Sequence, residues 1–181
     1  MAIVCNLANN LLRTTSCGYQ LSEIVDIFLI NYNDLAGTPE ITASEVGQDE
    51  VTAVTLNSGA SVYHIEPAKN SASFEDTLVV EDNGIKYRNA SVSFTVAGAY
   101  SKVLHASIDA LSLGRYTCVL KTAEGVYVML GRIAPLEAEV VTLAGGSDTN
   151  GIQVTLSGNL AESPLTLSDA AVQDVLDEVA S

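Results

Sequence analysis

Apolar and polar residues alternate with two different periods along this chain, and the shorter period dominates. Residues 24–32 form the most apolar run, nine residues long and rich in β-branched side chains, which predicts a strand buried on both faces. Gly37, Pro39 and Gly47 mark the long loop that follows, with a short strand at 40–42. Period-two segments predict further strands at 51–56, 61–66, 115–121, 126–131, 137–143 and 152–158.

Turn residues indicate how two pairs of these strands connect. Asn57, Ser58 and Gly59 predict a hairpin between residues 51–56 and 61–66. Residues 122–125 predict another hairpin, between 115–121 and 126–131. The glycine-rich segment 144–151 is expected to be a flexible loop.

Residues 71–100 predict one long β-hairpin, which is the dominant local signal of the chain. Its arms are residues 73–81 and 85–96, and its tip is Asp82-Asn83-Gly84. Asn-Gly between two β-rich arms favours a tight turn, because the turn positions need positive φ angles. Arms of about ten residues exceed the usual strand length, and an isolated ribbon is marginal in water. The hairpin is therefore expected to lie on a core or on a neighbouring subunit.

The register of this hairpin is ambiguous in the sequence. A two-residue turn would place Glu81 opposite Lys86 and would lead to Phe74 opposite Ser93 at the base. A slip of one residue instead pairs Phe74 with Val92 and moves every side chain to the other face. We therefore predict a β-bulge partway along the hairpin.

A helical period appears in two places. Leu104, Ile108 and Leu111 recur along residues 101–112, with Ser101 as the expected N-cap and a glycine, Gly114, at the end. A second helix is predicted at 169–179, capped by Ser168, with Val172, Val175, Leu176 and Val179 on one face. This C-terminal helix is expected to fray or to dock on a neighbour.

Together these elements predict a mainly β protein. The expected fold is a β-sandwich or open barrel with one packed central helix, a long hairpin and a C-terminal helix. The chain has 181 residues, which suits one domain, 1–181. Within it we expect an N-terminal arm at 1–20, the hairpin at 71–100 and a C-terminal helix or arm at 165–181.

Charge and cysteine content narrow the function classes. Eight basic against 22 acidic residues give a formal charge of −14, which repels nucleic acid and anionic membranes. The start of the chain lacks a basic leader, and no apolar run approaches the roughly 20 residues of a membrane span. Cys5, Cys17 and Cys118 are an odd number without framework spacing, which indicates free thiols in a reducing cytoplasm.

Residues that could carry chemistry are few. His64 and Glu66 match the first half of a zinc-deaminase motif, but the paired cysteines of its second half are absent. His105 is expected at the boundary of the central helix, and residues 148–151 resemble a calcium loop without its closing glutamate. We predict no catalytic, cofactor or metal site and no enzymatic activity.

With no chemistry elsewhere, the hairpin becomes the predicted functional element. Exposed sheet edges are hazardous unless they are capped or used, and a head-to-tail contact between copies closes as a ring or extends as a tube. The predicted oligomer interface comprises the apolar, turn and tip-proximal residues of the hairpin: Phe74, Leu78, Val80, Asn83, Gly84, Tyr87 and Arg88.

The order of elements over residues 20–160 resembles the tail tube (major tail) proteins of tailed bacteriophages. It is also similar to the tube proteins of contractile injection systems, and the sequence style resembles structural proteins of phages that infect Bacteroidetes. The matching pieces are the hairpin at 73–96, the helix at 101–112 and the strand pairs after it. The resemblance implies six copies whose inner sheets join into one lumen, with the hairpin and the N-terminal arm linking successive rings.

The resemblance also implies a function and partners. The chain would be a virion tail protein, made in the host cytoplasm, that assembles with itself and meets other tail or portal proteins. Inner strands would present Asp, Glu, Ser and Thr to the lumen, and DNA would pass without adhering. A capsid decoration or head–tail connector protein is the alternative. A carbohydrate- or peptide-binding β-sandwich is a second alternative, which ten aromatic residues without tryptophan support poorly.

Overall fold

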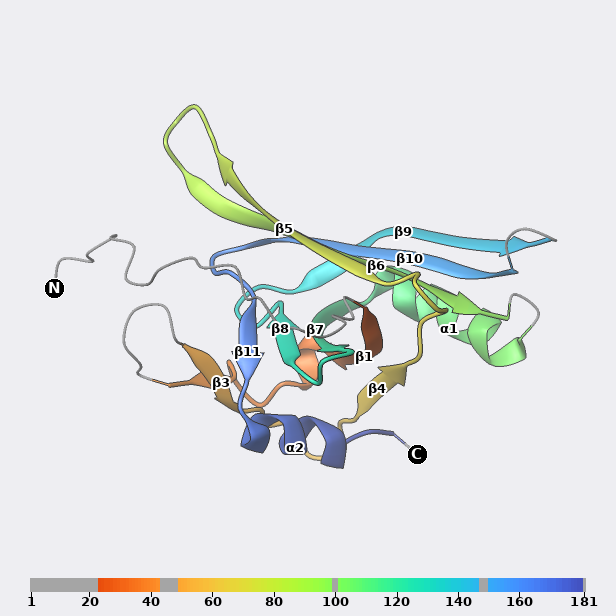
Figure 1. The fold of residues 1–181 in the computed structure, drawn as a ribbon, viewed down its shortest axis with the longest axis horizontal. Coiled ribbons are helices and arrows are strands. Elements are labelled where there is room, and N and C mark those ends of the chain that lie inside the picture. Colours follow the sequence, from red (N-terminus) through yellow and green to blue (C-terminus); the bar gives the residue numbers. More distant parts are fainter. Residues whose placement is uncertain (1–22, 43–48, 99–100, 147–149, 181) are drawn as a thin grey trace, which may run out of the picture.

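Eleven strands of one mixed sheet, folded into layers, make up most of the molecule (Figure 1). The structure is a computed structural model, and it describes residues 23–42, 49–98, 101–146 and 150–180. The predicted N-terminal arm at 1–20 lies outside these residues. The strands are β1 Ile24–Asn31, β2 Glu40–Ile41, β3 Glu50–Ala53, β4 Val62–Ile65, β5 Ser73–Val80, β6 Lys86–Ala97, β7 Arg115–Thr122, β8 Tyr127–Leu130, β9 Leu136–Gly145, β10 Asn150–Leu160 and β11 Leu165–Leu167. A 3-10 turn, η1 Tyr32–Asp34, and two α-helices, α1 Lys102–Leu113 and α2 Asp169–Asp177, complete the elements.

Two separate cores explain the long apolar run of β1. Alternate residues of β1 point to opposite faces, so Ile27 and Leu29 enter one core while Phe28 and Ile30 enter the other. β7 pairs antiparallel with β1 and divides its side chains between the cores in the same way. The prediction of a strand buried on both faces is confirmed: Ile27 and Ile30 have no exposed surface.

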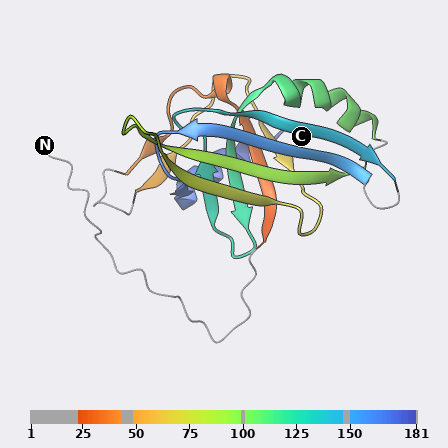
Figure 2. The same cartoon turned by 90° about the horizontal axis from the view of Figure 1, so that it is seen from above.

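β1 and β7 form a middle layer. The first core lies between this layer and a four-stranded outer sheet in the order β9-β10-β6-β5. Figure 2 shows these four strands side by side over the top of the molecule. Val92 and Phe94 of β6 pair with Leu156 and Val154 of β10, and all four are buried. The second core lies below, where Val51 and Leu167 meet Ala171 and Val175 of α2.

Both predicted helices are present, and the mainly β fold class with few helices is confirmed. α1 lies against β9 at one end of the first core, with Leu104, Ile108 and Leu111 half-buried. Ser168 caps α2 as predicted, since its hydroxyl accepts a hydrogen bond from the Ala171 amide. α2 packs on its own chain, and the segment after it pairs with β4 through a Val62–Val179 bridge.

Ser101 and Gly114 flank α1 as predicted, but they act differently. Ser101 stands at the N-cap position in extended conformation without a side-chain capping bond. Gly114 has φ −81°, so its role is not a left-handed cap. A Cβ there would lie 2.0 Å from the Tyr116 hydroxyl, which itself donates a 2.8 Å hydrogen bond to the Ala110 carbonyl. Glycine is therefore required for the close approach of the Tyr116 ring.

The predicted hairpin between residues 51–56 and 61–66 is wrong, although both strands exist. β3 pairs with β2 and β11, whereas β4 pairs with β1. The turn is real, because the Ala60 amide donates to the Asn57 carbonyl and Gly59 has φ +83°. It carries the chain from one layer to another. The second predicted hairpin, β7 with β8, is formed.

The predicted loop at 144–151 is shorter than expected. Gly145 ends β9 and Asn150 begins β10, and these two residues pair directly. The calcium-loop resemblance at 148–151 therefore falls partly within β10. Residues 147–149 lie outside the described residues.

The long hairpin is formed by β5 and β6, but its register and turn differ from the prediction. Phe74 pairs with Val92 and Val80 with Lys86 in one continuous ladder, so the predicted bulge is wrong. The Glu81 amide donates to the Ile85 carbonyl, which leaves a three-residue loop in place of a two-residue turn. Gly84 alone supplies a positive φ, +82°. The extra loop residue changes the strand register by one residue, which is the change that the predicted bulge would have produced.

Candidate functional site: the outward sheet face and the hairpin arm

The four-stranded outer sheet has one face on the core and one face turned away from it, which we call the outward face. Strand alternation places on it the residues that lie between the core-facing residues along each strand. From β5 and β6 it carries Ser73, Glu75, Thr77, Val79, Tyr87, Asn89, Ser91, Ser93, Thr95 and Ala97. From β10 and β9 it carries Gly151, Gln153, Thr155, Ser157, Asn159, Glu137, Val140, Thr142 and Ala144.

Hydroxyl, amide and acidic groups dominate the outward face. The basic residues of these four strands, Lys86 and Arg88, point to the core side. Glu75 and Glu137 are the charged residues that the strand pairing assigns to it, and Glu137 forms a 3.0 Å ion pair with Arg115 on the neighbouring end of β7. Glu139 is exposed at the register shift of β9 and has no partner in the ladder. The face is thus polar and weakly acidic, without a lysine or arginine of its own strands.

Several of these side chains are already hydrogen-bonded to one another across the strands. Ser93 and Thr155 hydroxyls lie 3.0 Å apart, and the Asn89 amide donates to the Asn159 carbonyl oxygen at 3.0 Å. Since paired polar groups have less need of an outside partner, this surface is suited to solvent contact more than to tight binding.

In the part of the chain that the structure describes, neither edge strand of the outer sheet has a second strand beside it along its full length, although α1 lies against β9. β5 pairs with β6 and with no other strand. β9 pairs with β10 along its length, but with β7 only at Tyr116–Leu136 and Arg115–Glu137. Neither strand contains a proline or lysine, residues that commonly protect an edge. These edges lie on opposite sides of the sheet and offer unpaired backbone groups.

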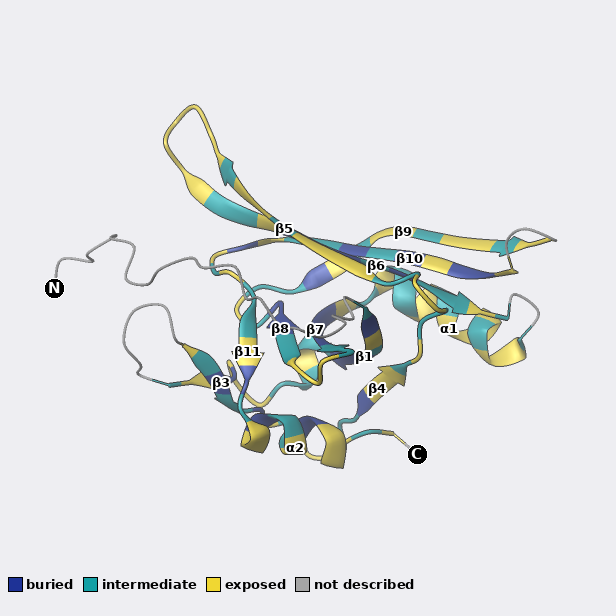
Figure 3. Cartoon of the chain, viewed as in Figure 1, coloured by how far each residue is buried: buried dark blue, intermediate teal, exposed yellow. Residues whose placement is uncertain are grey.

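The distal part of the hairpin, which we call the arm, is residues 78–88. β10 ends where Leu160 pairs with Arg88, so beyond that row β6 has β5 as its single partner. The arm leaves the body at one end of the molecule (Figure 1) and is largely exposed (Figure 3). Its β5 strand is apolar on both faces: Leu78 and Val80 point one way, opposite Arg88 and Lys86, and Val79 points the other way, opposite Tyr87.

Such a ribbon lacks cover from its own chain. Leu78, Val80 and Ile85 are 53%, 56% and 56% exposed. Strands that are apolar on both faces normally lie between two layers. The arm is therefore built for burial that the described monomer does not provide.

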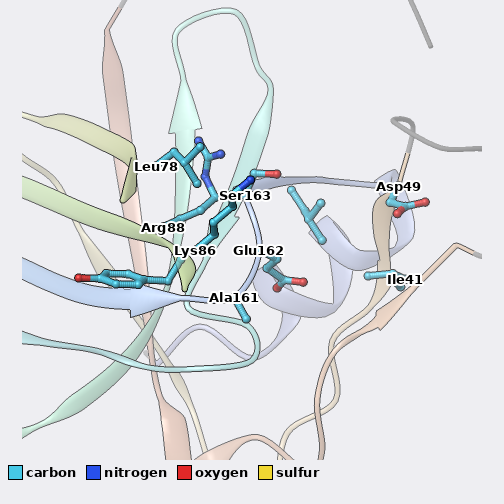
Figure 4. A pocket seen from close by; sticks show the side chains of 10 residues that line it. Ile41, Asp49, Leu78, Lys86, Arg88, Ala161, Glu162 and Ser163 are labelled. Carbon is cyan, nitrogen blue, oxygen red and sulfur yellow. The ribbon is translucent and has the colours of Figure 1, made fainter. Parts of the chain in front are cut away.

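A small pocket of about 430 Å³ lies where the arm meets the body (Figure 4). Leu78, Lys86 and Arg88 line it from the arm, and Glu162 and Asp49 from the opposite side. Glu162 is already held by the Arg132 guanidinium, which also donates to the Pro39 carbonyl at 2.9 Å. Of its four charged lining residues, Arg88 and Glu162 are already paired within the chain, so half of its charge is neutralised internally.

The predicted interface residues are divided by the structure. Phe74, Leu78, Val80 and Arg88 share the core-side face of the ribbon, whereas Tyr87 lies on the outward face. Asn83 and Gly84 form the tip, where the Asn83 side chain accepts a hydrogen bond from the Ile85 amide at 3.0 Å. Sequence alternation could have assigned these faces once the register was known.

A second, larger pocket of about 930 Å³ was not predicted from the sequence. It lies between α1 and β4 and opens into the first core. Its walls include Leu104 and Ile108 of α1, Phe94 of β6 and Ile152 of β10, with Glu66 and Asn31 among the polar lining groups. The sequence feature related to this pocket is the apolar stripe of α1. The structure leaves that stripe half-buried.

The histidines stand in different settings. His64 Nε2 lies 2.9 Å from Asp26 Oδ1, and its ring stacks on Phe28. Lys121 donates to the other oxygen of Asp26 at 3.0 Å. Burial alone would raise the pKa of Asp26, but the hydrogen bonds from His64 and Lys121 lower it below its ordinary value. His105 lies apart on the exposed side of α1.

These groups do not form a recognisable reaction centre. Within the described residues, no three His, Cys, Asp or Glu side chains are grouped so as to hold a metal ion. Cys118 is fully buried, and burial raises the pKa of its thiol, which disfavours the reactive thiolate. The cluster of Asp26, His64 and Lys121 ties β1, β4 and β7 together.

Comparison of the chain with protein-family models, with curated proteins and with solved structures finds no match. Among the described helices, neither is long and apolar enough to cross a membrane.

Proposed function

We propose that this chain is a virion structural protein that assembles with itself into rings or a tube, as a tail tube or tail ring, and forms a conduit for genome passage. The observation that carries the proposal is the outer sheet. One face covers a core, the other is polar and free of lysine and arginine, and neither edge strand has a second strand along its full length.

Edge-to-edge pairing between copies would use these features together. β5 of one copy can add to β9 of the next, because each edge presents unpaired backbone groups and the edges lie on opposite sides of the sheet. Such a contact is heterologous, so it closes as a ring where the rotation between copies closes, and otherwise extends as a helical assembly. The outward faces would then form one continuous wall around a lumen.

The chemistry of that wall suits the passage of DNA. Binding to phosphates depends on lysine and arginine, and the outward face of each copy offers Glu75 and hydroxyl groups instead. The whole chain carries a formal charge of −14 per copy. Like-charge repulsion would keep DNA from adhering to the wall.

The apolar arm supports contact with a neighbouring copy. A shortened variant tests this, in which an Asn-Gly turn joins Leu78 to Arg88 in place of residues 79–87. The variant keeps the Asp76–Arg88 ion pair and the outer sheet. We expect the wild-type chain to sediment as rings or longer assemblies and the variant to stop at smaller species. A wild-type chain that stays monomeric at every concentration contradicts the proposal.

The same measurement addresses the alternative of a capsid decoration or head–tail connector protein. Such a protein would need capsid or portal to assemble. It would therefore remain monomeric alone and bind when those partners are added.

A further inference from the structure

The arm and the pocket between α1 and β4 are two exposed apolar features with opposite shapes. The arm projects and the pocket is recessed. Figure 1 shows the arm and α1 towards opposite ends of the long axis. No described residue fills the pocket, and core residues such as Phe94 and Ile152 form part of its wall while being themselves buried.

One pair of opposite charges could also meet, although the tip of the arm carries Glu81 and Asp82 as well. The pocket lining contains Glu66 and no lysine or arginine. The arm carries Lys86 opposite Val80, and Lys86 forms no ion pair within the described chain. Arg88 is different, because Asp76 holds it at the base of the arm.

We propose that the arm of one copy docks into the α1–β4 pocket of the next copy. Leu78, Val80 and Ile85 would enter the recess, and Lys86 would meet Glu66 at its rim. α1 would cover one face of the ribbon and the sheet the other, which gives a strand apolar on both faces the two-sided burial it lacks. This inference rests on the proposed self-assembly and names the surface that receives the arm.

Docking of this kind is heterologous, since the projection and the recess are different surfaces of one chain. Each copy therefore has one arm to give and one pocket to fill. A copy that lacks only its arm and a copy that lacks only its pocket should together make a single contact and then stop.

Two variants test this property. Val80→Glu with Ile85→Glu puts charge on two exposed positions of the arm. Ser107→Trp places a bulky ring at an exposed α1 position that lines the pocket. The matched control is Ala106→Trp, which adds the same ring one residue away, at an exposed position outside the pocket lining. Far-ultraviolet circular dichroism establishes that each variant is folded.

Sedimentation velocity of each variant alone and of the 1:1 mixture gives the result. We expect both variants to need at least about tenfold more protein than wild type to assemble, a change of about 1.4 kcal/mol. The mixture should form a 1:1 complex through the one remaining arm and pocket, and Ala106→Trp should assemble like wild type.

Four results overturn the inference. Normal assembly of Ser107→Trp while wild type forms rings removes the pocket as receptor and leaves the proposed function standing. A mixture that forms no 1:1 complex argues against an arm-in-pocket contact. Binding of a peptide of residues 1–22 to the pocket, with arm variants unaffected, makes that segment the occupant. A wild-type chain that never assembles overturns both proposals.

Discussion

Arg88 Nε donates a 2.6 Å hydrogen bond to Asp76 Oδ2 across the two strands of the long hairpin, at the row where β10 ends and the arm begins. The Asp76 side chain is 9% exposed, and its other oxygen, Oδ1, is buried without a hydrogen-bond partner in the described structure. The pair therefore holds a mostly buried carboxylate at the base of the arm and links the arm to the body.

Loss of this pair should destabilise the fold. Arg88→Ala leaves the Asp76 carboxylate buried with neither oxygen bonded, and we expect the free energy of unfolding to fall by about 1.5–3 kcal/mol. Asp76→Ala combined with Arg88→Ala should cost less than Arg88→Ala alone, because no charge is stranded. Urea unfolding followed by circular dichroism gives both values. Equal losses in the single and double variants would show that the stranded charge does not matter.

The Asp26 cluster predicts a pH dependence of stability. Burial works to raise the pKa of Asp26, but hydrogen bonds from His64 and Lys121 hold it below 3.8 in the folded chain. A lowered folded-state pKa contributes stability that is fully present above the unfolded pKa, near 3.8, and is lost as the pH falls towards the folded value. Asp26→Asn should remove this part of the acid sensitivity.

The measurement is the urea midpoint at several pH values from neutral to about pH 3. Wild type and Asp26→Asn should differ most at neutral pH and converge below about pH 4. A constant difference between them across this range would contradict the expected role of the carboxylate. Lys121→Met is a companion variant, since it removes one of the two donors to Asp26.

Gly151 is required by the packing of β10 on β6. A Cβ at this position would lie 2.2 Å from the Val96 carbonyl oxygen, a backbone atom held in the strand ladder. Gly151→Ala should lower the free energy of unfolding by about 1–3 kcal/mol. Gly37→Ala is the control, because nothing lies within 4 Å of a Cβ there, and it should be neutral or slightly stabilising. Similar thermal midpoints for both variants would contradict this packing.

The sequence predicts individual strands and helices well, but it does not predict which distant strands pair. The β1 strand and the helix with Leu104, Ile108 and Leu111 could be predicted from the sequence, because burial of one or both faces sets the spacing of apolar residues along an element. The pairing of β3 was not, since its partner residue Thr166 is 116 positions from Glu50 and no local signal links them. The turn at Asn57–Gly59 is real, yet a turn alone does not decide which strands pair.

The register of the hairpin could not be predicted from its turn residues either, and the prediction was wrong by one residue. Asn83-Gly84 favours a two-residue turn, but Gly84 is the one residue of the tip with positive φ, and a three-residue loop forms. Packing of Val92 and Ala90 into the first core fixes the register, and the turn adapts to it. The two-sided apolar character of the arm was present in Leu78-Val79-Val80. Its exposure depends on where β10 ends.

A charge change on the outward face should make assemblies adhere to DNA. Gln153 is exposed on this face in β10, and Gln153→Lys adds one positive charge per copy to the proposed wall. Assemblies of this variant should retain double-stranded DNA at low salt and release it as salt rises, whereas wild type should not retain it. Gln173→Lys on the exposed side of α2 is the matched control. Equal retention by both variants would mean that the outward face does not line the DNA path.

The most direct test of self-assembly through the outer sheet is negative-stain electron microscopy of the purified wild-type chain over a range of concentrations. The account predicts rings with a central hole, or tubes built from stacked rings. In a reconstruction, the β9-β10-β6-β5 sheet should face the hole, with β5 of one copy beside β9 of the next. Isolated single-chain particles at every concentration, or rings whose hole is lined by α2, would contradict it.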